Sequence, residues 1–232
     1  MRLAVIPARG GSKRIPRKNI KPFCGKPIMA WPIEAAIESG CFDRVIVSTD
    51  DQEIAETARR FGAETPFMRP AEISDDHATT ADVMAHAAEW QRANGQAAEH
   101  ICCIYPTAPF VRPQDLREGL ARLMQEGCSY VFSAASYAFP IARAIRLISG
   151  IRVAMYYPEH QNTRSQHLEE AYHDAGQFYW GTSEAWRMRH PIFSGQSAAL
   201  VLPRYRVQDI DTAEDWERAE WMFRQLTEAK DL

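Results

Sequence analysis

Short apolar runs and longer segments of helical period alternate along most of this 232-residue chain, and this alternation limits its possible folds more than any other feature. Apolar runs of roughly four to eight residues are typical of buried strands. We expect such strands at Arg2–Pro7, Arg44–Ser48, Ile101–Tyr105 and Tyr130–Ala134. Helical periodicity lies between and after them, at Met29–Ser39, Asp51–Phe61, Ala81–Asn94 and Pro113–Glu126. Such alternation favours parallel strands joined by right-handed crossovers, so the sequence predicts a three-layer α/β/α sandwich.

This rhythm fails between residues 136 and 170, where Pro140, Gly150 and Pro158 interrupt any clean period. We expect residues 136–170 to form a small protruding segment, a lid or a dimerisation arm that packs on a partner chain. The whole of residues 1–232 is otherwise expected to form one domain. Regular structure resumes after the segment, with expected strands at Gly176–Gly181, Ala199–Pro203 and Arg206–Ile210 and expected helices at Thr182–Met188 and Thr212–Thr227.

Charge and cysteine content exclude several classes of protein. The chain has 27 Lys and Arg against 30 Asp and Glu, a net charge of −3, which argues against a protein that coats nucleic acid or an anionic membrane. No run approaches the roughly 18 apolar residues of a membrane span, and the apolar start is too short for a signal peptide. The five cysteines are odd in number and lack zinc spacing. We therefore expect a cytoplasmic chain with reduced thiols, no nucleic-acid partner and no membrane partner.

A basic loop follows the first expected strand. Residues 9–21 contain six Lys or Arg and no acidic residue, a concentration that repels itself unless an anion is present. Ligands of open parallel sheets bind at the carboxyl ends of the strands. Gly10 and Gly11 allow the backbone to approach an anion, while Arg9 and Arg17 can grip phosphate oxygens and Lys18 can act as a point charge. A solvated basic loop is the alternative. Neither a P-loop nor a G-x-G-x-x-G motif is present.

Six short motifs, in the same order along nearly the whole chain, carry a family resemblance. They are Ala8–Lys13, Pro16–Asn19, Val47–Asp50, Arg69–Glu72, Tyr105–Pro109 and Asp209–Thr212. Together they resemble the cytidylyltransferases that activate nonulosonic acids, of which the CMP-sialic acid synthetases are the best-known members. The run Tyr172–Trp180 is similar to the pseudaminic acid branch. The resemblance implies a fold like that of the nucleotide-diphospho-sugar transferases, with a mixed, mostly parallel sheet.

The same resemblance implies a reaction and its residues. CMP is expected to pass from CTP to the C2 hydroxyl of pseudaminic acid, with release of pyrophosphate, and Arg9, Lys18 and Asp211 are the expected catalytic residues. The expected nucleotide-binding residues are Ala8, Arg9, Gly10, Gly11, Ser12, Asn19, Arg69, Thr79, Thr80, Pro106 and Thr107. The alternatives are a CMP-sialic acid, CMP-legionaminic acid or CMP-Kdo synthetase, a sugar-1-phosphate nucleotidyltransferase, and a non-catalytic nucleotide-binding protein.

Two carboxylates near the C-terminus form a candidate metal site. Asp209 and Asp211 are two residues apart in an expected strand, so both would face one side, about 7 Å apart. Two carboxylates complemented by water and substrate phosphates suit Mg²⁺, which is the expected cofactor. In the alternative, Asp211 and Thr212 only cap the following helix, with Asp215 completing a capping box.

The candidate sugar-binding residues lie around the end of the irregular segment. Arg164 suits the carboxylate of a sugar acid, and amide and aromatic groups suit its other substituents. The expected set is Arg164, Tyr172, His173, Asp174 and Gln177. A satisfied polar network is the alternative. The six tryptophans are expected in the core, with Trp180 the one placed closest to the pocket.

Overall fold

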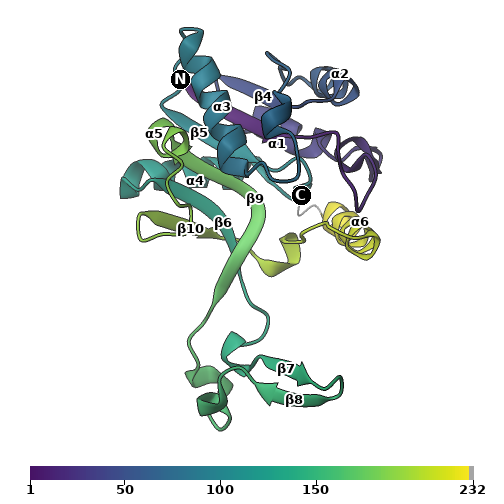
Figure 1. The fold of residues 1–232 in the computed structure, drawn as a ribbon, viewed down its shortest axis with the longest axis vertical. Helices are drawn as coiled ribbons and strands as arrows, with labels where there is room; N and C mark the ends of the chain where they lie inside the picture. The colour runs from purple at the N-terminus through teal and green to yellow at the C-terminus, as the bar shows by residue number, and fades with distance from the viewer. Residues whose placement is uncertain (230–232) are drawn as a thin grey trace.

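A six-stranded sheet forms the centre of the computed structural model, which describes residues 1–229 (Figure 1). Its strand order is β10-β6-β9-β5-β1-β4. The strands are β1 (Arg2–Pro7), β4 (Arg44–Ser48), β5 (His100–Ile104), β6 (Tyr130–Ser136), β9 (Tyr172–Thr182) and β10 (Ser197–Val201). Every pairing is parallel except the two made by β9, which runs antiparallel to both β5 and β6. The mixed, mostly parallel sheet is therefore confirmed.

Helices cover both faces of the sheet and complete the three layers. Because side chains alternate along a strand, Ala4 and Ile6 of β1 point to one apolar cluster and Leu3 and Val5 to another. The first cluster lies beneath α1 (Ala30–Ser39), α2 (Gln52–Arg60) and α4 (Pro113–Glu126). The second lies beneath α3 (Thr80–Ala93) and α5 (Ser183–Arg187).

A third apolar cluster holds the C-terminal helix α6 (Ala213–Glu228) against the chain that follows β1. The short hairpin of β2 (Pro22–Phe23) and β3 (Lys26–Pro27) supplies Phe23, whose ring meets Trp216 and Phe223 edge-on at centroid distances of 5.4 Å. Such aromatic pairs stabilise a core beyond the area that they bury. The packing brings the start of α6 beside the basic loop.

The chain before α6 differs from the sequence prediction. The strand expected at Arg206–Ile210 is wrong, because a 3-10 turn spans Arg204–Arg206 and residues 207–211 are irregular. The buried Arg206 guanidinium makes a two-point ion pair with Asp115 of α4, at 2.6 and 3.1 Å, and its carbonyl accepts a hydrogen bond from Gln177. These side-chain contacts hold the segment in place of a strand ladder.

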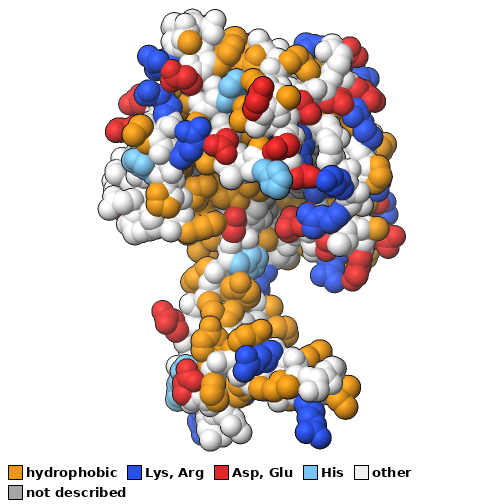
Figure 2. All heavy atoms as spheres, in the orientation of Figure 1, with side chains coloured by type: hydrophobic (Ala, Val, Ile, Leu, Met, Phe, Trp, Pro, Cys, Tyr) orange, Lys and Arg blue, Asp and Glu red, His pale blue; other side chains and the backbone are white. Residues whose placement is uncertain are grey.

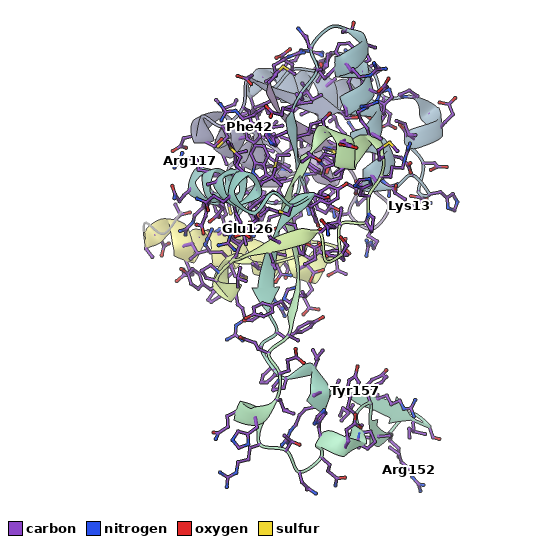
Figure 3. All side chains as sticks on the ribbon, turned by 90° about the vertical axis from the view of Figure 1, so that its left-hand side faces the viewer. Lys13, Phe42, Arg117, Glu126, Arg152 and Tyr157 are labelled. Carbon is purple, nitrogen blue, oxygen red and sulfur yellow. The ribbon has the colours of Figure 1, made fainter. Side chains whose placement is uncertain are left out.

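Residues 137–171 leave the sandwich as an arm, shown below it in Figure 1. The arm contains the hairpin of β7 (Ile145–Ile148) and β8 (Arg152–Met155) and three 3-10 turns, at Ile141–Arg143, Pro158–His160 and Ser165–His167. Figure 3 shows Arg152 and Tyr157 on the arm, far from Lys13 on the sandwich. Within residues 1–229, no helix is long and apolar enough to cross a membrane.

Trp180 is not near the pocket. Its ring is fully buried on β9 and stacks on Phe42 at a centroid distance of 4.8 Å, and its indole N–H donates to the carbonyl of Leu116 in α4. The expectation that Trp180 lies closest to the pocket is wrong, because the period of two along β9 points this ring into the apolar cluster below α4.

Candidate active site

A cleft of about 450 Å³ opens at the carboxyl ends of the parallel strands β1 and β5. Its walls come from the loop after β1, the segment that leads into α3, and the loop after β5. These segments meet there because the carboxyl ends of parallel strands lie at one edge of a sheet. The cleft is thus at the place where the sequence predicts anion binding.

The loop after β1 is held by hydrogen bonds to its own backbone. The buried amide of Asn19 donates to the carbonyl of Arg9 at 2.9 Å, which ties the two ends of the loop together. The Gly10 N–H donates to Asp50 Oδ1 at 2.9 Å. A Cβ atom at Gly10 would lie 2.8 Å from Asp51 Oδ2, whereas a Cβ atom at Gly11 would meet nothing within 4 Å. Gly10 therefore permits a close backbone approach and Gly11 lies beside open space.

Carboxylates of this chain neutralise the basic loop. Arg9 and Lys13 both pair with Asp76, and the hydrogen bond from Lys13 lowers the pKa of that carboxyl. Arg17 pairs with Asp51 and Glu53 at 2.5 Å each, and the hydrogen bond to Asp51 raises the pKa of its guanidinium. Arg17 does not line the cleft, so the prediction that it grips phosphate is not supported by its position.

Arg69 forms part of the wall opposite the basic loop. Its side chain is only 3% exposed, and burial lowers its pKa against the opposing effect of Asp50. The Nε atom donates to Ser74 at 3.1 Å. Deeper in the cleft, the Thr80 hydroxyl lies 3.2 Å from the Tyr105 hydroxyl. This wall offers one guanidinium and two hydroxyls to a ligand.

Asp209 and Asp211 lie at the basic loop, although not in a strand. Asp211 pairs with Arg14 at 2.8 Å and with Lys18 at 3.5 Å, while Lys18 also donates to the Ile210 carbonyl. Burial and the neighbouring Asp211 carboxylate raise the pKa of Asp209. Two mutually repelling carboxylates, one of them desolvated, form a donor set that fits a hard divalent cation. The capping box of Thr212 and Asp215 is also present.

The structure brings together most of the predicted nucleotide-binding residues. Those that line the cleft are Arg9, Ser12, Asn19, Arg69, Thr80, Pro106 and Thr107, joined by the predicted catalytic residue Lys18. Ala8 lies in the core, and Gly10 and Gly11 belong to the loop after β1 but do not line the cleft. Thr79 caps α3 through a capping box with Asp82 and does not line the cleft. Its position gives it a helix-starting role.

The predicted sugar-binding residues do not line this cleft. Both carboxylate oxygens of Asp174 are occupied, one by the Gly176 N–H at 2.8 Å and the other by the Tyr179 hydroxyl at 2.5 Å. The buried Gln177 amide donates to the Arg206 carbonyl at 2.6 Å. The alternative of a satisfied polar network therefore describes Asp174, whereas the buried Gln177 Oε1 atom has no hydrogen-bond partner within residues 1–229.

The other three members of that set lie further from the cleft. Tyr172 donates to Glu170 at 2.7 Å, and the His173 ring packs edge-on against Tyr137 at 5.0 Å, both where the arm meets the sheet. Arg164 lies within the arm, at the start of its last 3-10 turn. The five residues predicted to bind the sugar therefore do not form one site. They are spread over β9, the end of β9 next to the arm, and the arm itself.

Sequence reasoning missed several residues of the cleft. Asp76 pairs with two loop cations, Tyr105 lines the floor, and Asp50 contacts both Gly10 and Arg69. Asp50 and Asp51 both lie between β4 and α2, yet only Asp51 caps α2, through the Ile54 N–H at 3.0 Å. Because one carboxylate is enough to cap a helix, two adjacent ones in the sequence could have indicated a second role for Asp50.

Comparison with known proteins shows the family of this chain. A family model described as cytidylyltransferase matches residues 3–230. The chain belongs to the cytidylyltransferase family. Among curated proteins, this cytidylyltransferase is 45% identical over 222 residues to the pseudaminic acid cytidylyltransferase of Campylobacter jejuni, with 96% of each chain covered. It is 33% identical over 219 residues to the N-acylneuraminate cytidylyltransferase of Oncorhynchus mykiss, of which it spans 49%.

Solved structures agree on the fold of the cytidylyltransferase. A CMP:2-keto-3-deoxy-manno-octonic acid synthetase complexed with CTP superposes with a TM-score of 0.71 at 16% identity, over 97% of this chain and 98% of that one. A 4-diphosphocytidyl-2C-methyl-D-erythritol synthase from Anaerococcus prevotii gives a TM-score of 0.65 at 11% identity. The shared fold confirms the nucleotide-diphospho-sugar transferase-like architecture that the sequence motifs imply.

Proposed function

We propose that this enzyme transfers CMP from CTP to the C2 hydroxyl of pseudaminic acid and releases pyrophosphate. The observation that carries the proposal is the 45% identity to a pseudaminic acid cytidylyltransferase across 96% of both chains. The cleft agrees with a triphosphate ligand, since Arg9, Lys13 and Lys18 line one side of it. The hydroxyls and guanidinium of the opposite wall suit a ribose and a base.

In this reaction the protein has to position the two substrates and neutralise the charge of the triphosphate. The C2 hydroxyl oxygen forms a bond to the α-phosphorus of CTP while the bond to pyrophosphate breaks, and the hydroxyl proton passes to solvent water. Arg9 and Lys18 are placed to hold phosphate oxygens on which negative charge accumulates. Such preorganised cations lower the barrier because they need no rearrangement during the reaction. This geometry makes Arg9 and Lys18 the proposed catalytic cations.

Asp209 and Asp211 would hold Mg²⁺ at the edge of the cleft. When bound, the ion supplies charge neutralisation to the triphosphate and lowers the pKa of an adjacent hydroxyl. Within residues 1–229, no group of three or more His, Cys, Asp or Glu side chains is arranged around a metal site. Two carboxylates with phosphate and water as the remaining ligands match the usual preference of Mg²⁺.

The arm fits a role in a homodimer, which we propose as the working assembly. Its apolar side chains are largely exposed, with Phe139 82%, Leu147 70% and Ile151 86% accessible, and Figure 2 shows apolar side chains along its length. Exposed apolar surface of this extent marks an interaction site. Light scattering that gives a monomer at micromolar concentration would contradict this assembly.

The proposed cell compartment is the cytoplasm, and the proposed domain is the whole chain. All five cysteines are free, and the consecutive residues Cys102 and Cys103 of β5 are buried on opposite faces of the sheet. Reduced thiols agree with a reducing compartment. The chain is then one cytidylyltransferase domain from which residues 137–171 project.

Pyrophosphate release with several sugar acids tests the function. The enzyme is offered CTP and Mg²⁺ with pseudaminic acid, sialic acid, legionaminic acid or Kdo in separate reactions. We expect kcat/KM to be at least about tenfold higher for pseudaminic acid, equivalent to about 1.4 kcal/mol of transition-state discrimination. A higher value for another sugar would reassign the substrate, and no release with any of the four would refute the proposal.

A further inference from the structure

Asp50 contacts both walls of the nucleotide cleft without lining it. We propose that Asp50 is a positioning residue for the transfer reaction: one carboxylate oxygen accepts the Gly10 N–H and attracts the Arg69 guanidinium, and so sets the two sides of the cleft relative to each other. The proposal rests on the function proposed above. It assigns to Asp50 a role distinct from that of Asp51, which caps α2.

The sheet topology explains why residue 50 is the one placed between the walls. The chain leaving β1 lies on one side of the end of β4, where the Ala8 N–H donates to the Ser48 carbonyl at 2.9 Å. Residues 64–69 lie on the other side, and the Arg69 N–H donates to the Thr49 carbonyl at 2.8 Å. The first side chain beyond these pairings belongs to Asp50.

Both contacts use the same atom of that side chain. Asp50 Oδ1 lies 2.9 Å from the Gly10 nitrogen and 3.6 Å from the Arg69 terminal nitrogen NH2. That nitrogen is buried and has no hydrogen-bond partner within residues 1–229. A single oxygen that both groups share links their positions, because neither can move away without weakening one contact.

The negative charge of Asp50 would repel the triphosphate that the cleft is proposed to bind, so its presence requires a physical explanation. Burial lowers the pKa of Arg69, and the positive charge of Arg9 lowers it further, whereas Asp50 acts in the opposite direction. The Asp50 carboxylate therefore favours the charged form of Arg69 in a buried place beside a second cation. This benefit offsets the repulsion between Asp50 and the phosphates.

The test compares Asp50→Ala with Asp50→Asn by calorimetry of three ligands in the absence of sugar. Tripolyphosphate probes the loop side, CMP probes the Arg69 side, and CTP spans both. We expect Asp50→Ala to weaken CTP at least about tenfold, and more than it weakens either shorter ligand, because only CTP needs both walls in register. Asp50→Asn keeps an oxygen that accepts the Gly10 N–H, so its affinity for tripolyphosphate is expected to stay within about threefold of the wild-type value.

Asp43 supplies a matched control. It lies at the opposite end of the same pair of strands, and its carboxylate accepts the Arg2 N–H at 2.6 Å, the same type of bond far from the cleft. Asp43→Ala is expected to leave CTP affinity unchanged. Three results would overturn the proposal. The first is wild-type CTP affinity in Asp50→Ala, and the second is an equal loss of CTP affinity in Asp43→Ala and Asp50→Ala. The third is an equal loss of tripolyphosphate affinity in Asp50→Asn and Asp50→Ala. The substrate assignment is tested separately, since it fails when wild-type enzyme releases no pyrophosphate.

Discussion

The ion pair between Asp115 and Arg206 offers a quantitative test of how the segment bearing Asp209 and Asp211 is held. The two side chains are 9% and 6% exposed, and their contacts of 2.6 and 3.1 Å have two-point geometry. Removing one partner of a buried pair costs about 3–5 kcal/mol, because the remaining charge stays buried without compensation. For a chain of this size, each kcal/mol lowers Tm by about 2–4 °C. Asp115→Asn is therefore expected to lower Tm by about 6–20 °C.

Two further variants decide whether the buried charge is the cause. Glu214→Gln breaks the exposed pair with Arg218 on α6, where we expect a loss of about 0.5 kcal/mol or less. The double variant Asp115→Leu with Arg206→Met replaces both charges by apolar groups and is expected to recover most of the stability.

Urea unfolding and thermal melts provide the assay. If Asp115→Asn costs less than about 1 kcal/mol, or if the double variant is no more stable than the single one, the reasoning is refuted. Turnover supplies a second readout, because the Arg206 carbonyl is bonded to Gln177 and the chain reaches Asp209 three residues later. We expect the double variant to recover stability with less recovery of kcat.

Three more predictions follow from the cleft. Asp211→Ala is expected to fold normally and to lose about 10²–10³ in kcat, and an unimpaired rate under limiting Mg²⁺ would contradict its role as a ligand. Gly10→Ala is expected to lower Tm and CTP affinity because its Cβ would lie 2.8 Å from Asp51, whereas Gly11→Ala keeps the Tm of the wild type. The raised pKa of Asp209 means that the native state holds this proton more tightly than the unfolded chain, so stability falls as pH rises from 3.8 through the raised value. Asp209→Asn removes the destabilising effect of this charged carboxylate, so it is expected to raise Tm at neutral pH while it lowers Mg²⁺-dependent turnover. An unchanged Tm would contradict the raised pKa of Asp209.

Elements with a strong local pattern could be predicted from the sequence. Arg2–Pro7, Arg44–Ser48 and Pro113–Glu126 have the predicted bounds because apolar period and flanking turn residues agree there. The direction of β9 could not be predicted in this way. Strand periodicity is the same in both directions, and the antiparallel pairing follows from the route of the chain through the arm.

The same distinction between local patterns and long-range contacts applies to the site residues. The basic loop was found because a cluster of charge is visible in the sequence, whereas the partners of that charge are distant in sequence and close in space. Asp76 lies 63 residues from Lys13 and Asp115 lies 91 residues from Arg206, so only the fold brings them together. The strand expected at Arg206–Ile210 was wrong because such a tertiary contact overrides local propensity.

The carboxylates around the basic loop already pair with its cations. In the binding mode proposed above, CTP takes cations such as Arg9 and Lys13 from Asp76 instead of filling a positive surface without counter-charges. The gain in affinity is the difference between two sets of ion pairs, so salt should weaken binding less than the number of basic residues alone indicates. The same carboxylate is available to reclaim those cations when pyrophosphate departs, which favours turnover over product retention.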